Sequence, residues 1–290
     1  MNRNIPFLLI LAIALAACGG AATPTGEDLA ATPATGGEAL PPEPHEVTFT
    51  ASDGQELAGL YYPAAVTPAP VVVFMHWNAG DKSDWYELAP WLQNRGLENP
   101  FENPGDETWW DPTWFPAVPE RISYSVFIFS FRNCSPYEAG CPEMTPKFWL
   151  LDAQAAMETA RDLEGVDPSR VAAIGSSIGA DGALDGCAWL NEQHPGSCQG
   201  ALSFSPGGYL GIPYPETVGE LGGNDPATTA WCVADESEYA VCEAAKAAGN
   251  SAYQSYEVPG GSHGNRLLNP ELEPLPMQLI LDFLAAVFPG

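Results

Sequence analysis

The segment from Val171 to Gly182 limits most strongly what this chain can fold into. It begins with a β-branched apolar run, Val171 to Ile174, which favours a strand, and it ends in small residues with helical character. Between them, residues 175–179 read Gly-Ser-Ser-Ile-Gly and match the pattern G-x-S-x-G. A sharp strand-to-helix turn of this kind needs small residues around its central serine and holds the serine oxygen at its tip. We interpret Ser177 as a candidate nucleophile, and the alternative is an ordinary Gly/Ser turn.

Strand patterns alternate with helical patterns along most of the remaining chain. The length suits one large α/β domain or two small ones. A hairpin is expected around the Asp53-Gly54 turn. Further strands are predicted at 71–75, 124–131, 200–205, 228–234 and 251–258, and helices at 85–95, 148–163, 184–190, 238–248 and 275–288, with 206–226 as a Gly/Pro-rich loop. This alternation predicts a mostly parallel sheet covered by helices on both faces.

The first 17 residues have the pattern of a secretory signal peptide. One positive charge at Arg3 precedes an apolar run from Phe7 to Ala17, and Leu15-Ala16-Ala17-Cys18 ends it. The end of this run resembles the lipobox of bacterial lipoproteins, which implies cleavage before Cys18 and lipidation of its thiol. The alternative is an ordinary signal peptide or an uncleaved anchor, although a membrane span takes about 20 apolar residues. We therefore expect a lipid-anchored protein outside the cytoplasm.

Residues 18–45 are rich in Gly, Ala, Thr, Pro and Glu and cannot bury a core. This composition predicts a flexible tether, followed by a folded domain from 46 to 290.

The chain is strongly acidic, with a formal net charge of −27, and removal of residues 1–17 takes away Arg3 and no acid. Such a charge repels nucleic acid and anionic membrane surfaces and argues against polyanionic substrates. We interpret the spread-out acids as a source of solubility.

Six cysteines remain after Cys18, and they fall into three local pairs. We expect the disulfides Cys134–Cys141, Cys187–Cys198 and Cys232–Cys242 in an oxidising compartment, although six cysteines allow 15 connectivities. Metal binding is less favoured, because no C-x-x-C pattern or histidine cluster accompanies them.

Two further groups complete a catalytic order after Ser177. Acids at 235–238 and then His263 each follow a predicted strand. A serine hydroxyl needs a base such as His263 to take its proton, and an acid orients the imidazole. Asp235 lies directly at the strand end and is favoured as this acid, with Glu238 as the alternative.

The loop after the strand at 71–75 is the second anchor of the site. In a hydrolase sheet this loop donates one oxyanion-hole N–H, and the residue after the nucleophile donates another. The candidates are the backbone N–H groups of Asn78 and Ile178. His76 is interpreted as structural.

Residues 97–120 interrupt the alternation with a stretch rich in tryptophan and proline. Loops this long inside a domain are usually functional. We interpret the stretch as a lid or wall over the active site, with Trp110 and Trp114, together with Trp77, contacting an apolar substrate. The alternative is a surface excursion whose tryptophans pack onto the body.

Residues 46–290 resemble the α/β-hydrolase superfamily, in particular bacterial dienelactone-hydrolase-like and esterase-like lipoproteins. The resemblance is carried by residues 73–85 (VFMHWNAGDKSDW), 171–179 and 261–264 (GSHG). Trp77 stands where many members have glycine, and Ser177 stands where dienelactone hydrolases proper have cysteine. The resemblance implies the α/β-hydrolase fold and ester chemistry, with neither a metal nor an organic cofactor.

The sequence therefore predicts a serine hydrolase that cleaves a small ester or related acyl substrate through an acyl-enzyme. A peptidase or acyltransferase on the same fold is the alternative enzyme. A non-catalytic lipoprotein that binds a ligand is the alternative outside enzymes.

Overall fold

The alternation of side chains along β3 (Ala69–Met75) divides the interior into two layers. Val71, Val73 and Met75 belong to one buried cluster, whereas Val72 and Phe74 belong to another. Successive strand residues point to opposite faces of a sheet, so a strand that is apolar at every position must be covered on both faces. The strand predicted at 71–75 is therefore present, and its continuous apolar run is buried on both faces.

The computed structural model describes residues 39–104, 110–134, 141 and 145–289. The chain divides into two units, 1–35 and 36–290, and all described residues belong to the second. The strands are β1 (His45–Thr50), β2 (Glu56–Tyr62), β3, β4 (Ser125–Phe129), β5 (Val166–Ser176), β6 (Cys198–Phe204), β7 (Thr229–Ala234) and β8 (Tyr253–Glu257). The α-helices are α1 (Leu88–Gln93), α2 (Pro146–Arg161), α3 (Ile178–Gln193), α4 (Tyr214–Gly222), α5 (Ala240–Ala245) and α6 (Pro276–Val287).

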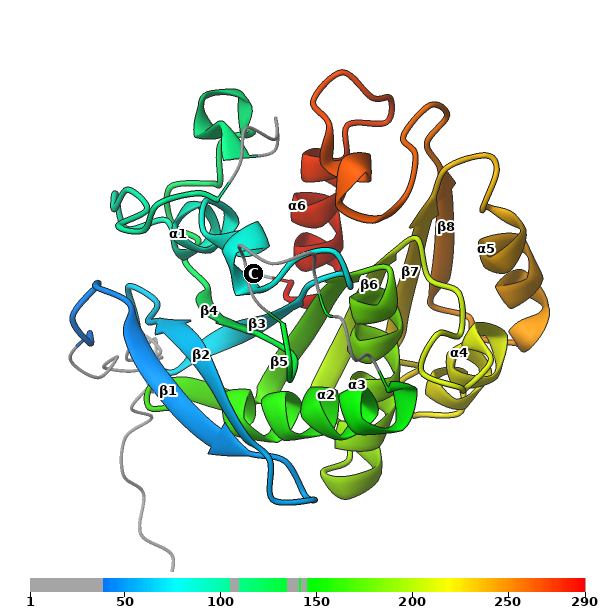
Figure 1. The fold of residues 1–290 in the computed structure, drawn as a ribbon, viewed down its shortest axis with the longest axis horizontal. Coiled ribbons are helices and arrows are strands. Elements are labelled where there is room, and N and C mark those ends of the chain that lie inside the picture. Colours follow the sequence, from blue (N-terminus) through cyan, green and yellow to red (C-terminus); the bar gives the residue numbers. More distant parts are fainter. Residues whose placement is uncertain (1–38, 105–109, 135–140, 142–144, 290) are drawn as a thin grey trace, which may run out of the picture. The chain divides into compact units, whose positions relative to one another are not determined.

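The described strands form one sheet in the order β1-β2-β4-β3-β5-β6-β7-β8 (Figure 1). β2 runs antiparallel to both of its neighbours, and the other pairings are parallel. The expected hairpin is the β1–β2 pair. Parallel strands place their carboxyl ends at one edge, so the loops after β3, β5, β7 and β8 meet there.

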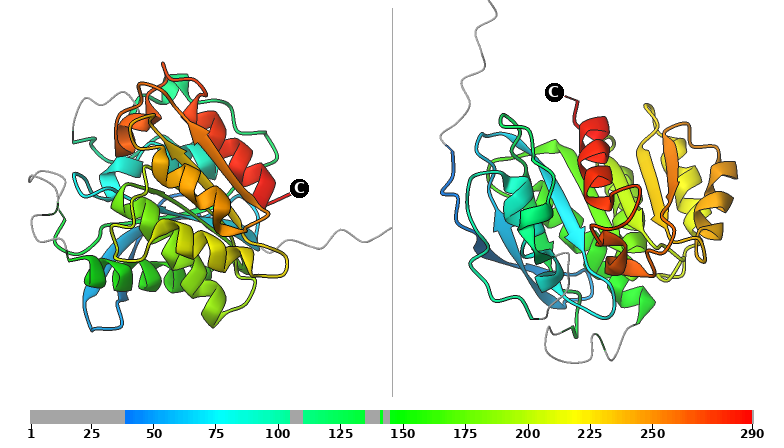
Figure 2. Two further views of the ribbon diagram at one scale, coloured as in Figure 1. Left: turned by 90° about the vertical axis from the view of Figure 1, so that its right-hand side faces the viewer. Right: turned by 90° about the horizontal axis from the view of Figure 1, so that it is seen from above.

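Helices cover both faces of the sheet, as the sequence predicts. Buried residues of α2, α3, α4 and α5 join one core cluster, and those of α1 and α6 join the other. Figure 2 shows α6 (red) and α3 (green) on opposite sides of the strands.

Helix α4 lies within residues 206–226, which the sequence analysis interpreted as a loop. That interpretation was wrong, because proline is tolerated in the first turn of a helix and Pro215 occupies that place. Gly219 and Gly222 mark close packing, since a Cβ at Gly222 would lie 2.6 Å from the Cα of Asn250. Tyr214, Val218 and Leu221 form the buried stripe.

The domain begins a few residues before the predicted boundary. Leu40 and Pro42, placed in the tether by composition, accept hydrogen bonds through their carbonyls from Arg95 and Gln93. The predicted signal peptide, Cys18 and most of the tether lie outside the described residues. Among the helices of the described part, none has the length and apolar character needed to cross a bilayer.

All three predicted disulfides are present: Cys134–Cys141, Cys187–Cys198 and Cys232–Cys242. The second joins α3 to β6, and the third joins β7 to α5.

The start of α3 lies directly against the end of β3. A Cβ at Gly179 would lie 2.3 Å from the carbonyl oxygen of Met75 and 2.5 Å from that of His76. Glycine is required here because an added methyl group has no room against backbone that cannot move aside.

We expect Gly179→Ala to lower the free energy of unfolding by about 1–3 kcal/mol, the usual cost of overpacking a buried contact. Urea unfolding followed by circular dichroism measures this change. The matched control is Gly223→Ala, where φ is −78° and the nearest atom lies 3.2 Å from the added Cβ. Equal stability of the two variants would contradict the close contact.

Candidate active site

Ser177 stands at the turn between β5 and α3 in a backbone conformation that side chains rarely adopt. Its φ is 54° and its ψ is −120°. The turn is held because the N–H of Ser177 donates to the carbonyl of Phe204 at 2.7 Å and the N–H of Ala180 donates to the carbonyl of Ser177 at 2.9 Å. Strained positions persist only where the surroundings fix them, and they gather at functional sites. The G-x-S-x-G segment therefore forms the sharp turn that its pattern predicts.

The first glycine of the pattern has its own steric reason. A Cβ at Gly175 would lie 1.9 Å from the carbonyl oxygen of Gly179. Strand and helix can approach this closely only when both positions lack side chains, and the approach leaves the Ser177 oxygen at the tip of the turn.

His263 follows β8 and lies against Ser177. Its Nε2 is 2.7 Å from the Oγ of Ser177, and its Nδ1 is 2.8 and 2.9 Å from the two carboxylate oxygens of Glu238. In this arrangement the serine hydroxyl donates to Nε2, and the Nδ1–H donates to the carboxylate. The geometry joins a hydroxyl, a base and an orienting acid in one chain of hydrogen bonds.

Glu238 occupies the place beside His263 for which the sequence analysis favoured Asp235. The Oδ1 of Asp235 accepts from the N–H of Ser237 at 2.9 Å and from its hydroxyl at 2.6 Å. These contacts, with the Ser237 hydroxyl foremost, lower the pKa of Asp235 to about 2. The short aspartate side chain is thus engaged in its own turn, whereas the longer glutamate, three residues on, reaches the imidazole.

Three acids of this turn each hold a different part of the histidine loop. Besides Glu238 on His263, the Oδ2 of Asp235 accepts from the N–H of Ser262 at 3.3 Å. Glu236 accepts from the N–H of Gly260 at 2.8 Å. Asp235 therefore holds the backbone of its own turn and of the histidine loop, whereas the imidazole is held by Glu238.

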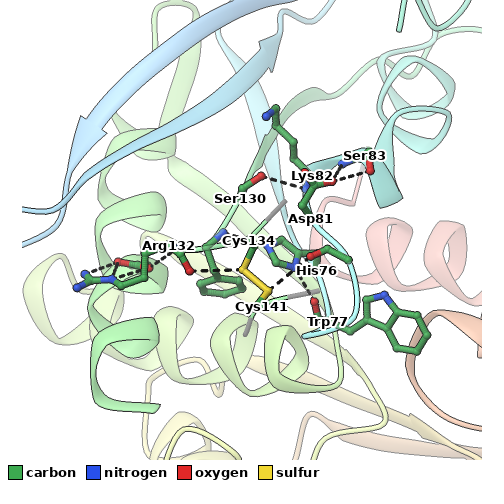
Figure 3. The surroundings of a disulfide bond; sticks show 12 residues. His76, Trp77, Asp81, Lys82, Ser83, Ser130, Arg132, Cys134 and Cys141 are labelled. Carbon is green, nitrogen blue, oxygen red and sulfur yellow. Dashed lines mark hydrogen bonds and ion pairs between the residues drawn. A yellow bond between two sulfur atoms is a disulfide. The ribbon is translucent and has the colours of Figure 1, made fainter. Parts of the chain in front are cut away.

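The loop after β3 is fastened to the segment after β4. The carbonyl of Asn78 accepts from the N–H of Cys141 at 2.9 Å, and Cys141 is bonded to Cys134 (Figure 3). Lys82 donates its N–H to the Ser130 hydroxyl at 3.3 Å. These contacts hold the segment that carries Asn78. The N–H of Ile178 stands at the first position of α3, where backbone donors have no partner within the helix. The oxyanion roles of Asn78 and Ile178 stay predictions.

His76 is a buried structural residue, as interpreted from sequence. Its Nδ1–H donates to the carbonyl of Trp77 at 2.6 Å, and its Nε2 accepts from the N–H of Phe131 at 3.0 Å. Burial lowers the pKa of His76 to about 4, so the ring is neutral at neutral pH. A ring nitrogen of His76 and the sulfurs of Cys134 and Cys141 all lie within 4.8 Å of one another. The two sulfurs are bonded to each other, so they offer no thiolate to a metal.

Two aromatic rings flank His263. The Trp77 ring lies 6.5 Å from the imidazole, centroid to centroid, and is nearly parallel to it at 29°. The Tyr209 ring lies 6.3 Å away at 85°. Trp77 was predicted as a substrate contact and does border the site. Tyr209 was missed, because a tyrosine in a Gly/Pro-rich stretch carries no local signal of its position.

Trp110 and Trp114 pack against the core cluster that contains Trp85 and Leu88. The indole N–H of Trp110 donates to the carbonyl of Asp84 at 3.3 Å. This packing matches the alternative in which the tryptophans rest on the body, and the lid stays a prediction. Trp109 of this stretch lies outside the described residues.

Comparison with known proteins places the fold. No model of a protein family matches the chain. Curated relatives include the "Uncharacterized protein YfhR" of Escherichia coli (strain K12), 29% identical over 148 residues, which are 48% of this chain and 40% of that protein. The "Uncharacterized protein Rv2307c" of Mycobacterium tuberculosis is 29% identical over 140 residues, 48% of this chain and 39% of that protein. The chain thus spans about two fifths of the length of these relatives.

Similar solved structures cover most of the chain at low identity. A Pyrobaculum calidifontis esterase aligns with a TM-score of 0.56 and 15% identity, covering 84% of this chain and 85% of that one. A thermostable Pseudomonas putida esterase gives 0.55 and 17%, covering 87% and 82%. The dienelactone hydrolase-like promiscuous phosphotriesterase P91 gives 0.54 and 14%, covering 84% and 98%. At this identity the likeness establishes the fold alone, and the predicted α/β-hydrolase fold is confirmed.

The depressed pKa of His76 predicts a pH-dependent stability. Between the ordinary value of 6.5 and about 4, the unfolded chain binds a proton that the folded chain does not. The free energy of unfolding is therefore unaffected by His76 above pH 6.5. It falls by about 3 kcal/mol as the pH drops from 6.5 towards 4, because protonation stabilises only the unfolded chain. Urea unfolding at several pH values should show a steeper loss in the wild type than in His76→Gln. Burial raises the pKa values of Asp181 and Asp185, but both proteins contain these groups. Parallel pH profiles would contradict the prediction.

Proposed function

We propose that this chain, an α/β-hydrolase by fold, is a serine hydrolase that cleaves a carboxylic ester or related acyl substrate. One observation carries the proposal: Ser177, His263 and Glu238 form a continuous hydrogen-bonded relay at the carboxyl edge of the sheet. The aromatic walls at Trp77 and Tyr209 favour a substrate with apolar parts. The net charge of −27 disfavours polyanionic substrates.

The relay supports acyl transfer in two halves. The Oγ of Ser177 attacks the ester carbonyl carbon while its proton passes to the Nε2 of His263, and Glu238 stabilises the imidazolium through Nδ1. The negative charge that develops on the carbonyl oxygen is stabilised by the backbone N–H groups of Asn78 and Ile178 and by the N-terminus of α3. His263 then gives its proton to the departing alcohol oxygen. Water, activated by the same imidazole, releases the acid and restores Ser177.

We further propose that the protein is anchored by a lipid at Cys18, outside the cytoplasm. The sequence Leu15-Ala16-Ala17-Cys18 after an apolar run supports the anchor. The three disulfides support an oxidising compartment.

The relay predicts that substitutions of its members lower esterase activity by different amounts. Ser177→Ala and His263→Ala should abolish turnover of short-chain p-nitrophenyl esters, and Glu238→Gln should lower kcat by about 10⁴-fold because the imidazole loses its orienting carboxylate. Asp235→Asn should cost less, because its oxygens contact Ser237 and Ser262 and not the imidazole. Glu243→Gln, an exposed acid on α5, is the matched control.

Labelling of Ser177 by a fluorophosphonate probe runs in parallel with these assays. A deeper loss in Asp235→Asn than in Glu238→Gln would overturn the assignment of the acid. No turnover and no labelling of the wild type would favour the non-catalytic ligand-binding protein, whereas turnover of amides or transfer to alcohols would favour the peptidase or acyltransferase.

The anchor predicts that the mature chain incorporates radiolabelled palmitate in a bacterial host and partitions into a detergent phase. Cys18→Ser should abolish both, because the thiol is the site of lipidation. A chain that stays labelled after Cys18→Ser, or a wild type recovered in the aqueous phase, would refute the anchor.

A further inference from the structure

An apolar groove lies between the segment after β6 and helix α5. Gly207, Pro213 and Tyr214 line one wall, Ala240, Val241 and Ala244 line the other, and the volume is about 290 Å³. We call it the α4–α5 groove. It carries no charged side chain in its lining, so an apolar group is the ligand that it would shelter from water.

Tyr209 connects this groove to the site. One side of its ring lies edge-on to His263 at 6.3 Å between centroids. The ring also lies over Gly207, where an added Cβ would fall 2.3 Å from the Cζ of Tyr209. A single aromatic ring therefore extends from the imidazole to the wall of the groove. Its 40% exposure leaves it open to a substrate.

The opposite wall also begins at the relay. Glu238 hydrogen-bonds to His263, and Ala240, two residues later, is the first residue of α5 and part of the groove. Each wall thus begins two residues from a side chain that contacts His263, Gly207 from Tyr209 and Ala240 from Glu238.

A buried carboxylate fixes the segment that carries Tyr209. Asp181, in the first turn of α3 and 1% exposed, accepts from the N–H of Tyr209 at 2.6 Å and from the N–H of Gly207 at 3.3 Å. The groove wall is thereby tied to the helix that begins next to Ser177.

We infer that the α4–α5 groove binds the apolar alcohol portion of the ester, a step that rests on the proposed function. His263 must deliver its proton to the alcohol oxygen, so that oxygen lies within hydrogen-bond reach of Nε2. The substituent on this oxygen is therefore the part of the substrate nearest to His263. Tyr209, which lies edge-on to His263 and against Gly207 of the groove wall, links this part of the substrate to the groove. We therefore expect selectivity for esters of medium-length aliphatic alcohols.

Two isomeric esters test this assignment. Hexyl acetate places its apolar chain on the alcohol, and methyl heptanoate places it on the acid. Both release simple primary alcohols, so their ratio of kcat/KM, measured in a pH-stat with the mature chain, reports where the apolar chain is bound. We expect wild type to prefer hexyl acetate by about tenfold or more, since one methylene in an apolar pocket is worth that much.

Ala244→Trp fills the groove from α5 and should lower this preference by about tenfold. The control, Ala247→Trp, makes the same change three residues along, at an exposed position that does not line the groove, and should keep the preference. An equal loss on both esters in Ala244→Trp, a loss confined to methyl heptanoate, or an unchanged ratio overturns the assignment.

Labelling of Ser177 by a fluorophosphonate separates the two ways of failing. If the wild type is labelled and hydrolyses esters but shows no preference for hexyl acetate, the groove assignment falls and the proposed function stands. If it is neither labelled nor active, both fall.

Discussion

The contact between the start of α3 and the end of β3 is the constraint on which the site depends. Gly179 faces the carbonyls of Met75 and His76, and further along α3 a Cβ at Gly182 or Gly186 would lie 3.0 Å from Met75 or Met157. A helix without side chains along one stripe can pack against β3 and α2 far more closely than an ordinary helix. That depth places the start of α3, directly after Ser177, against the end of β3 and His76. The position of the nucleophile is thus set by the absence of side chains.

His263 is positioned by hydrogen bonds to carboxylates and not by close packing of glycines. The turn after β7 sends three carboxylates towards residues 260–263, and each accepts from a different donor: Gly260, Ser262 and His263. A partly buried backbone N–H group that donates to no acceptor is costly, so these contacts fix the loop as well as the imidazole. The position of the imidazole beside Ser177 therefore depends on the whole turn, and Glu238 is the acid of this turn that hydrogen-bonds to the imidazole.

Local sequence patterns were sufficient to predict the fold class and two members of the relay, Ser177 and His263. The G-x-S-x-G turn, the apolar run of β3 and the late His263 are readable because each depends on its immediate neighbours. The sequence could not decide between Asp235 and Glu238, because the choice depends on side-chain length and on the position of Ser262 in the loop after β8. Helix α4 could not be predicted because Gly219 and Gly222 favour a loop by local sequence. Both glycines pack closely against residues distant in sequence, Ala248 and Asn250. Tyr209 reaches His263 only through tertiary structure.

Two of the three disulfides fasten segments that border the site. Cys134–Cys141 lies next to Asn78, and Cys232–Cys242 closes the stretch that contains Glu238, while Cys187–Cys198 joins α3 to β6. Their sequence separations are only 7, 10 and 11 residues, so in the chain-entropy model each restricts a short part of the unfolded chain and stabilises the fold by about 3 kcal/mol or less. For Cys232–Cys242 the larger consequence is local, because this bond ties β7 to α5 across the stretch that carries Glu238. In a chain with a formal net charge of −27, a covalent bond holds this geometry without adding further charge.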